Sequence, residues 1–251
     1  MKKALVLAVV LMEITATVFA ANPFDEFNNK VAGAATEVAQ QYLDNFAKDL
    51  GAVLGGGTFH QGKTLGFPGF DIGIHVPAKK VRSDNEIVKA AGIDTFMFPA
   101  LQAEIGLPAK IDLLARYMGY AGSNLIGVGG RYGILKGSLP LMPSLSVQGI
   151  YSMLNVNADA NKFNATTISV GAVASFNIPV VDPYVGIGFD STSVEPDSSI
   201  SLPQAGMKGS ASAYRLEAGI NLSLFPLTYL QLGGVLINSD LSYTAGLGLK
   251  F

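Results

Sequence analysis

The sequence has no cysteine among its 251 residues, and only 14% of them are charged. The absence of cysteine excludes disulfide bonds, thiol catalysis, cysteine-ligated metals and a lipid-modified N-terminal cysteine. The formal net charge of −2 is close to neutral and argues against nucleic acid as a partner. Disulfide-stabilised, thiol-dependent and nucleic-acid-binding proteins are therefore disfavoured classes.

Long hydrophobic runs are also missing, although the composition is apolar. Hydrophobic residues make up 49% of the chain, and its mean hydropathy is +0.36, which is high for a soluble globular protein. Beyond the N-terminal segment, no stretch of about 18 uninterrupted apolar residues is present, so no transmembrane helix is predicted. If the chain is integral to a membrane, it must form a closed β-barrel, because only helices and closed barrels satisfy the backbone in lipid.

Residues 1–20 have the pattern of a secretory signal peptide. Lys2 and Lys3 precede an apolar run from Ala4 to Met12, and a small-residue cleavage site ends at Ala20. We therefore expect the protein to leave the cytoplasm.

A helical period follows the predicted cleavage site, between Asn22 and about Leu54. Apolar residues recur there every three or four positions, and this set is Phe24, Phe27, Val31, Ala35, Val38, Tyr42, Phe46, Leu50 and Val53. The pattern predicts one amphipathic helix of about eight turns. A helix is about 10–12 Å wide, which a ten-stranded barrel would barely admit. We therefore expect residues 22–57 to plug or cap the periplasmic mouth of a barrel, with a position in the membrane interface as the alternative.

The period changes to two after a glycine-rich connector, within the predicted barrel domain 58–251. The fold class predicted is all-β, a transmembrane antiparallel up-and-down β-barrel of about ten strands, with eight or twelve as alternatives. The strands are expected at Gly69–Val76, Thr95–Leu107, Lys110–Gly119, Asn124–Leu135, Ser144–Asn155, Asn164–Asn177, Val181–Ser191, Ser210–Leu224, Thr228–Asn238 and Leu241–Phe251.

The composition of the two strand faces favours a membrane barrel over a secreted β-sandwich or a lipocalin-like barrel. One face is apolar and carries no charge in any expected strand. This is expected of a face in contact with lipid, because a charge at the bilayer midplane costs about 2–4 kcal/mol. Aromatic residues fall near the ends of this face and would form two interfacial girdles: Phe70, Tyr117, Tyr132, Tyr151, Phe176, Phe189, Tyr214, Tyr243 and Phe251. The opposite face is rich in small and polar residues, which suits an enclosed lumen.

Charged residues on the second face are expected to line the lumen. They are Asp71, His75, Glu104, Asp112, Arg116, Arg131, Arg215, Glu217 and Lys250. One interpretation is a structural network of ion pairs, since isolated buried charges are heavily penalised. The other is a constriction, formed by the three arginines, that selects anions. Asp71 and His75 share a strand face, but no further residue completes an enzyme site, so we expect no catalytic residue, metal or cofactor.

The final strand, LSYTAGLGLKF from Leu241 to Phe251, resembles the closing strand of Gram-negative outer-membrane β-barrels. That resemblance implies a bacterial outer-membrane location, outer-membrane lipid as surroundings, and recognition of the last strand by the barrel-assembly machinery. An N-terminal segment before a barrel is also similar to the long-chain fatty-acid transporter family, in which an N-terminal hatch plugs the lumen. This likeness implies a plugged or narrow channel for small or hydrophobic solutes. The alternative is a structural or adhesive barrel that acts through two long loops, Pro77–Asp94 and Thr192–Gly209.

Overall fold

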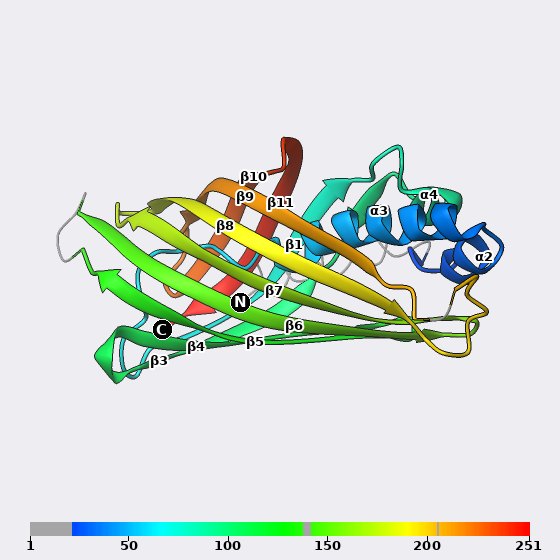
Figure 1. Ribbon diagram of the computed structural model, residues 1–251. Coiled ribbons are helices and arrows are strands. Elements are labelled where there is room, and N and C mark those ends of the chain that lie inside the picture. Colours follow the sequence, from blue (N-terminus) through cyan, green and yellow to red (C-terminus); the bar gives the residue numbers. More distant parts are fainter. Residues whose placement is uncertain (1–21, 138–141, 205) are drawn as a thin grey trace, which may run out of the picture.

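The computed structural model describes residues 22–137, 142–204 and 206–251, so the predicted signal peptide lies outside the described residues. Ten antiparallel strands form a closed barrel, because β1 pairs with β3 on one side and with β11 on the other (Figure 1). The barrel strands are β1 (Phe70–Lys80), β3 (Ala100–Leu107), β4 (Ile111–Tyr120), β5 (Ser123–Leu135), β6 (Pro143–Ala158), β7 (Asn161–Phe176), β8 (Val181–Pro196), β9 (Gly209–Leu222), β10 (Thr228–Ile237) and β11 (Asp240–Lys250). The predicted fold class and the number of about ten strands are confirmed.

Two details of the strand prediction are wrong. The segment 95–107 is not one strand: β2 (Thr95–Met97) pairs with the end of β1, and Phe98–Pro99 separates it from β3. The strands β6, β7 and β8 each have 16 residues, longer than the roughly 9–11 that a bilayer requires. Their extra length converts much of the expected loops into sheet that extends beyond one mouth of the barrel.

The barrel has the opposite polarity of a soluble protein. Large apolar side chains face outward, with Ile187 62% exposed and Val128 57% exposed, whereas Arg131 and Arg215 are almost completely buried inside. An apolar exterior around a polar interior is stable only where lipid replaces water at the outer surface. The barrel is therefore of the transmembrane type found in outer membranes.

The two mouths of the barrel differ. One mouth, which we call the near mouth, lies where β1 begins and β11 ends. It holds Phe70 and Phe251, whose backbones exchange two hydrogen bonds and close the strand ladder. The far mouth, at the opposite end, is covered by α2 (Phe27–Ala32), α3 (Thr36–Gly55) and α4 (Glu86–Ala90), as Figure 1 shows. None of the helices in the described part of the chain has the length and hydropathy needed to cross a bilayer.

The N-terminal segment differs from its prediction in both shape and place. It is two helices rather than one, because the chain breaks around Gly33. The break rotates the following helix, so Ala35 and Val38 of the predicted apolar stripe are exposed. The helices were expected to plug or cap the same mouth as Phe251, on the periplasmic side; the shared mouth is wrong, because the helices lie at the opposite end of the barrel from Phe251.

The helix α3 enters the far mouth despite the narrow lumen. Every residue from Asp49 to Gly55 is buried, so the last turns of the helix are surrounded on all sides. Small residues make this possible: a Cβ added to Gly55 would lie 2.6 Å from the carboxyl carbon of Asp190 on β8. Because glycine has no side chain, the helix is narrower at this point than the usual diameter of about 10–12 Å and fits into the lumen.

Candidate functional site

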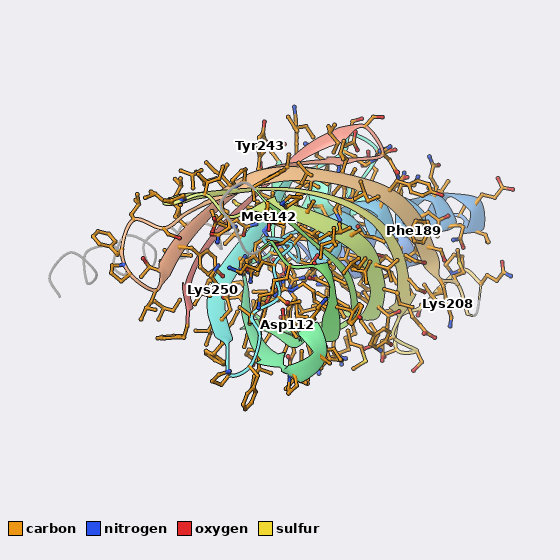
Figure 2. All side chains as sticks on the ribbon, turned by 90° about the vertical axis from the view of Figure 1, so that its left-hand side faces the viewer. Asp112, Met142, Phe189, Lys208, Tyr243 and Lys250 are labelled. Atoms are coloured by element: carbon orange, nitrogen blue, oxygen red, sulfur yellow. The ribbon has the colours of Figure 1, made fainter. Side chains whose placement is uncertain are left out.

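The lumen is occupied by the protein's own chain. After α3, residues 56–66 run from the far mouth toward the near mouth, and we name them the lumen connector. Residues 56–62 and Thr64 of this connector are buried. Its end reaches β4, where the Leu65 amide donates to both carboxylate oxygens of Asp112 at 3.1 and 3.2 Å. Figure 2 looks into the near mouth and shows Asp112 inside the ring of strands, with Tyr243 on the outside.

Two wall arginines bind the C-terminal end of α3. Arg116 donates to the carbonyl oxygens of Leu54 at 2.9 Å and Gly56 at 3.3 Å. Arg215 donates to the carbonyl oxygen of Gly55 and to Thr58 Oγ1. The last carbonyls of a helix have no partner within the helix and carry partial negative charge, so cations are favourable there. These two arginines therefore hold the helix end, whereas the anion constriction required them to face an open lumen.

Polar side chains of the wall bind the next three residues of the connector. Gln148 donates to the Thr58 carbonyl at 2.9 Å, Gln231 to the Phe59 carbonyl at 3.0 Å and Asn221 to the His60 carbonyl at 2.5 Å. The three donors come from β6, β10 and β9. Consecutive backbone carbonyls are thus satisfied from different sides of the barrel, which fixes the path of the connector through the lumen.

Wall glycines provide the space that the connector fills. A Cβ added to Gly186 would lie 3.0 Å from the Phe59 ring, and one added to Gly133 would lie 2.9 Å from Cγ2 of Thr64. Larger residues at these wall positions would collide with the connector. These contacts show that the wall glycines make room for the connector.

Each charged residue expected in the lumen lies inside the barrel. All are buried except Lys250, which is half-buried and donates to Gln61 Oε1 at 3.1 Å. Arg131 is bound by Glu104 and by Asp112, the latter at 2.8 Å. Its ion pairs therefore join strands β3, β4 and β5 of the wall.

A second ion-pair group surrounds Arg215. Its guanidinium lies 3.3 Å from Asp190 and 3.7 Å from Glu217. Asp190 was not among the predicted lumen residues, although it directly follows the outward-facing Phe189, so strict alternation would have placed it inside. In the described chain, Arg131 and Arg215 are thus held in ion pairs with carboxylates of the wall, whereas Arg116 is not.

A chain of hydrogen bonds crosses the lumen between the charged groups. It joins His60, Asp71, Tyr229, His75, Gln231, Tyr184 and Glu217 in that order. Asp71 and His75 therefore meet through the Tyr229 hydroxyl, and no direct bond between them is seen in the described chain. The sequence analysis did not identify three members of this chain, Tyr184, Tyr229 and Gln231. They are uncharged, and strand alternation alone does not distinguish them from other inward-facing residues.

The far mouth is closed by an apolar cluster rather than by polar groups. Phe24, Phe27 and Phe46 from the N-terminal segment pack with Phe163 at ring-centroid distances of 5.2, 4.4 and 5.3 Å. Phe163 is an inward-facing residue at the start of β7, in a stretch expected to be loop. The cluster anchors both helices to the extended part of the sheet.

A small polar group beside this cluster ties α3 to the segment after β1. Asp49 accepts hydrogen bonds from the Arg82 backbone at 3.1 Å and from the Asn85 side chain at 2.9 Å, and its other oxygen lies 3.5 Å from Lys79 Nζ. Burial raises the pKa of Asp49, and the hydrogen bonds from Asn85 and Arg82 only partly oppose this effect. The carboxyl is therefore held by directed bonds rather than by solvation.

The aromatic residues expected in the two girdles point outward. Tyr214 is 75% exposed, and the others are exposed except Phe189, which is half-buried and packs its ring 5.3 Å from that of Tyr214. An amphipathic tyrosine on the outer face is suited to the lipid headgroup region.

The fold and its occupied interior define a transmembrane β-barrel whose lumen is closed by an N-terminal segment. The chain belongs to the family described as "Family of unknown function (DUF6588)", which matches residues 1–91 and 85–250. No curated protein matches the sequence.

Several solved barrels resemble the chain weakly. The β-domain of the Bordetella autotransporter BrkA has 13% identity and a TM-score of 0.37, with 73% of this chain and 98% of that chain covered. Neisserial surface protein A has 14% identity and a TM-score of 0.35, with 73% and 97% covered. The N-terminal barrel of Pseudomonas aeruginosa OprF has 12% identity and a TM-score of 0.35, also with 73% and 97% covered. The fold described above follows from the strand pairing of this chain itself.

Proposed function

We propose that this protein is a channel of the bacterial outer membrane for small solutes, held closed by its own N-terminal segment. The observation that carries the proposal is the lumen connector, which fills a glycine-lined space and is bound to the wall through its backbone carbonyls. A barrel that only needed a filled interior could use the side chains of its own strands. A separate segment in a lumen shaped to accept it is the arrangement expected of a plug.

The bonds that hold the connector suit reversible release. A hydrogen bond contributes only about 0.5–1.5 kcal/mol net, because water replaces it when the partners separate. The apolar cluster around Phe46 behaves differently, since exposing each such side chain costs about 1.5–3 kcal/mol. We therefore expect α2 and the first turns of α3 to stay anchored while the last turn of α3 and the connector leave the lumen together.

The lining of the vacated lumen indicates the kind of solute. With the connector displaced, the near half would present the charged and amide groups of the wall, including Glu104, Arg131 and Gln231. Such a surface favours ions and small polar solutes over hydrophobic ones. Release of the connector also frees Arg116, whereas Arg131 and Arg215 keep their ion pairs with carboxylates of the wall.

A second candidate is a non-transporting barrel that acts through the surface of its far mouth. One observation favours it: the cap there is fixed by stacked phenylalanine rings and by contacts between distant segments. Asn161, at the β6–β7 turn, bonds the backbone of both Asp25 and Asn28. A rigid surface at the far mouth suits a structural or adhesive role.

A reversible lock on the connector distinguishes the two candidates. The chain has no cysteine, so the double variant T64C/G133C would contain a single possible disulfide. A Cβ on Gly133 would lie 2.9 Å from Thr64 Cγ2. The two Cβ atoms would then be within about 4.4 Å, inside the range that a disulfide accepts.

The measurement is single-channel recording of the purified barrel in planar bilayers across a range of voltages. We expect brief openings from the wild type and from the reduced double variant, and none from the oxidised variant. The single variants T64C and G133C serve as controls for the substitutions themselves. A wild type and a reduced variant that never open would refute the channel and support the non-transporting barrel.

A further inference from the structure

A buried group of metal-binding side chains lies where the connector meets the first two barrel strands. His60 belongs to the connector, Asp71 to β1 and Glu104 to β3. One potential ligand atom from each residue lies within 4.8 Å of the other two, and all three side chains are buried. His60 Nε2 is 3.3 Å from Asp71 Oδ2, and His60 Nδ1 is 3.7 Å from Glu104 Oε1.

The placement of the two carboxylates favours a cation between them. Asp71 and Glu104 are direct cross-strand partners on the inward face of β1 and β3. Like charges directly opposite each other in a sheet are destabilising, and burial from water increases that repulsion. A positive group between these carboxylates would relieve this repulsion.

The nearby side chains do not supply enough positive charge. Arg131 is the guanidinium that pairs with Glu104, and it also serves the carboxylate of Asp112. Three buried carboxylates thus face one arginine, which leaves two formal negative charges when the histidines are neutral. Lys250 is paired in register with Asp71, but its ammonium bonds Gln61, and no ion pair joins Lys250 to Asp71 in the described chain. A divalent cation would balance the two charges, whereas a proton on His60 would balance only one.

An unpartnered nitrogen points to the same conclusion. His60 is 2% exposed, and its Nδ1 has no hydrogen-bond partner among the described residues. His75 lies close by, but Gln231 occupies one of its nitrogens and Tyr229 the other. Of the two histidines, His60 is therefore the one whose ring is not held by hydrogen bonds at both nitrogens, and it can turn a nitrogen toward an ion between the carboxylates.

The orientation of the carboxylates is fixed by outer contacts, as is usual around metal ligands. The Tyr229 hydroxyl donates to the second oxygen of Asp71 at 2.9 Å, and Gln102 donates to Glu104 at 2.7 Å. Tetrahedral zinc sites have ligand bonds of about 2.0–2.2 Å, which places neighbouring ligand atoms about 3.3 Å apart. The 3.3 Å between His60 Nε2 and Asp71 Oδ2 matches this spacing, so Nε2 is the nitrogen that would face the ion. The Glu104 carboxylate, with a ligand atom within 4.8 Å of the other two, would move closer to complete the set.

We propose that His60, Asp71 and Glu104 bind one divalent transition-metal ion of the zinc type. One imidazole and two carboxylates form a ligand set that zinc accepts readily. The ion would join the connector to β1 and β3 and so fasten the plug to the wall. The proposal concerns the closed barrel and stands whether or not the barrel conducts.

The test is a zinc titration of purified, folded barrel after treatment with a chelator and its removal. Calorimetry and elemental analysis are expected to give one zinc ion per chain for the wild type. The variants H60Q and E104Q should bind zinc at least about ten-fold more weakly, because each lacks a ligand. T167V is the control and should bind like the wild type, since the Thr167 hydroxyl bonds Thr192 between two wall strands and none of the proposed ligands.

Two results would overturn the proposal: a wild type that binds no zinc at stoichiometric concentration, or an H60Q variant that binds as tightly as the wild type. Heat-dependent gel mobility verifies that each variant is a folded barrel before the titration. E104Q keeps the size of the side chain and replaces the carboxylate oxygen bound by Arg131 with an amide oxygen that can also accept, so it tests the site even if H60Q fails to fold.

Discussion

Replacement of Arg116 by methionine should weaken the docking of the plug without breaking an ion pair of the wall. Arg116 is 2% exposed, and its guanidinium donates to the carbonyl oxygens of Leu54 and Gly56. No carboxylate lies within ion-pair distance of it in the described chain. Methionine has a similar length and fills the same space with flexible apolar atoms. The main consequence of R116M is therefore two buried carbonyl groups that lose their donor.

The size of the effect follows from these two groups. A buried acceptor left without its partner costs about 1–3 kcal/mol. The variant also removes the cost of burying a guanidinium, which offsets part of the loss. A net weakening of the closed state by about 1–3 kcal/mol corresponds to an open population raised about 5- to 150-fold.

Single-channel recording measures this change directly as the fraction of time that the barrel is open. T167V is the matched control, because the Thr167 hydroxyl bonds Thr192 at 2.9 Å between two wall strands and makes no hydrogen bond with the carbonyls of the helix end in the described chain. We expect T167V to resemble the wild type and R116M to open far more often. If a folded R116M opened no more often than T167V, the role assigned to Arg116 would be wrong.

Two further predictions concern the cap at the far mouth. F46A should lower stability by about 3–5 kcal/mol, because Phe46 is buried among aromatic rings and its removal leaves a cavity; the temperature of the heat-dependent gel shift measures this loss, and an unchanged temperature would contradict it. The Arg82 guanidinium, through its hydrogen bonds, holds the pKa of the Asp84 carboxyl below its ordinary value of 3.8. The stability from this pair is therefore fully present above the ordinary pKa and is lost as the pH falls through the lowered one. We expect a small melting-temperature difference between wild type and D84N near pH 6 that disappears at more acidic pH, since the pair is partly exposed.

The sequence was sufficient to predict the barrel because lipid and lumen impose opposite demands on alternate residues. Leu241, Tyr243, Leu247 and Leu249 had to face outward, and the period of two then placed Lys250 and its neighbours inside. The same alternation continues into the extended strands, but polar residues such as Asn164 interrupt the apolar face there. The ends of β6, β7 and β8 were therefore mistaken for loops.

The position of the plug could not be predicted because its partners are not adjacent in any sequence pattern. The stripe around Phe46 shows that the helix buries one side, but Phe163 and Phe96 lie in stretches that looked like loop and strand end. The role of Arg116 was hidden for another reason. Its acceptors are backbone carbonyls, which every residue has, so no side-chain motif indicates them.

The interior of the barrel is divided along its axis, and this division sets how the plug can move. At the far mouth, the apolar rings of Phe24, Phe27 and Phe46 are buried, and exposing them to water is unfavourable, so this end behaves as a fixed anchor. Toward the near mouth, the carbonyls of Thr58, Phe59 and His60 bond groups that water can replace. The three arginine-bound carbonyls of the helix end, those of Leu54, Gly55 and Gly56, lie at the boundary between these halves. A substitution that weakens the bonds at this boundary should therefore release the connector and leave the anchored cap in place. An ion held by His60 would keep the connector bound to the wall after those bonds are lost.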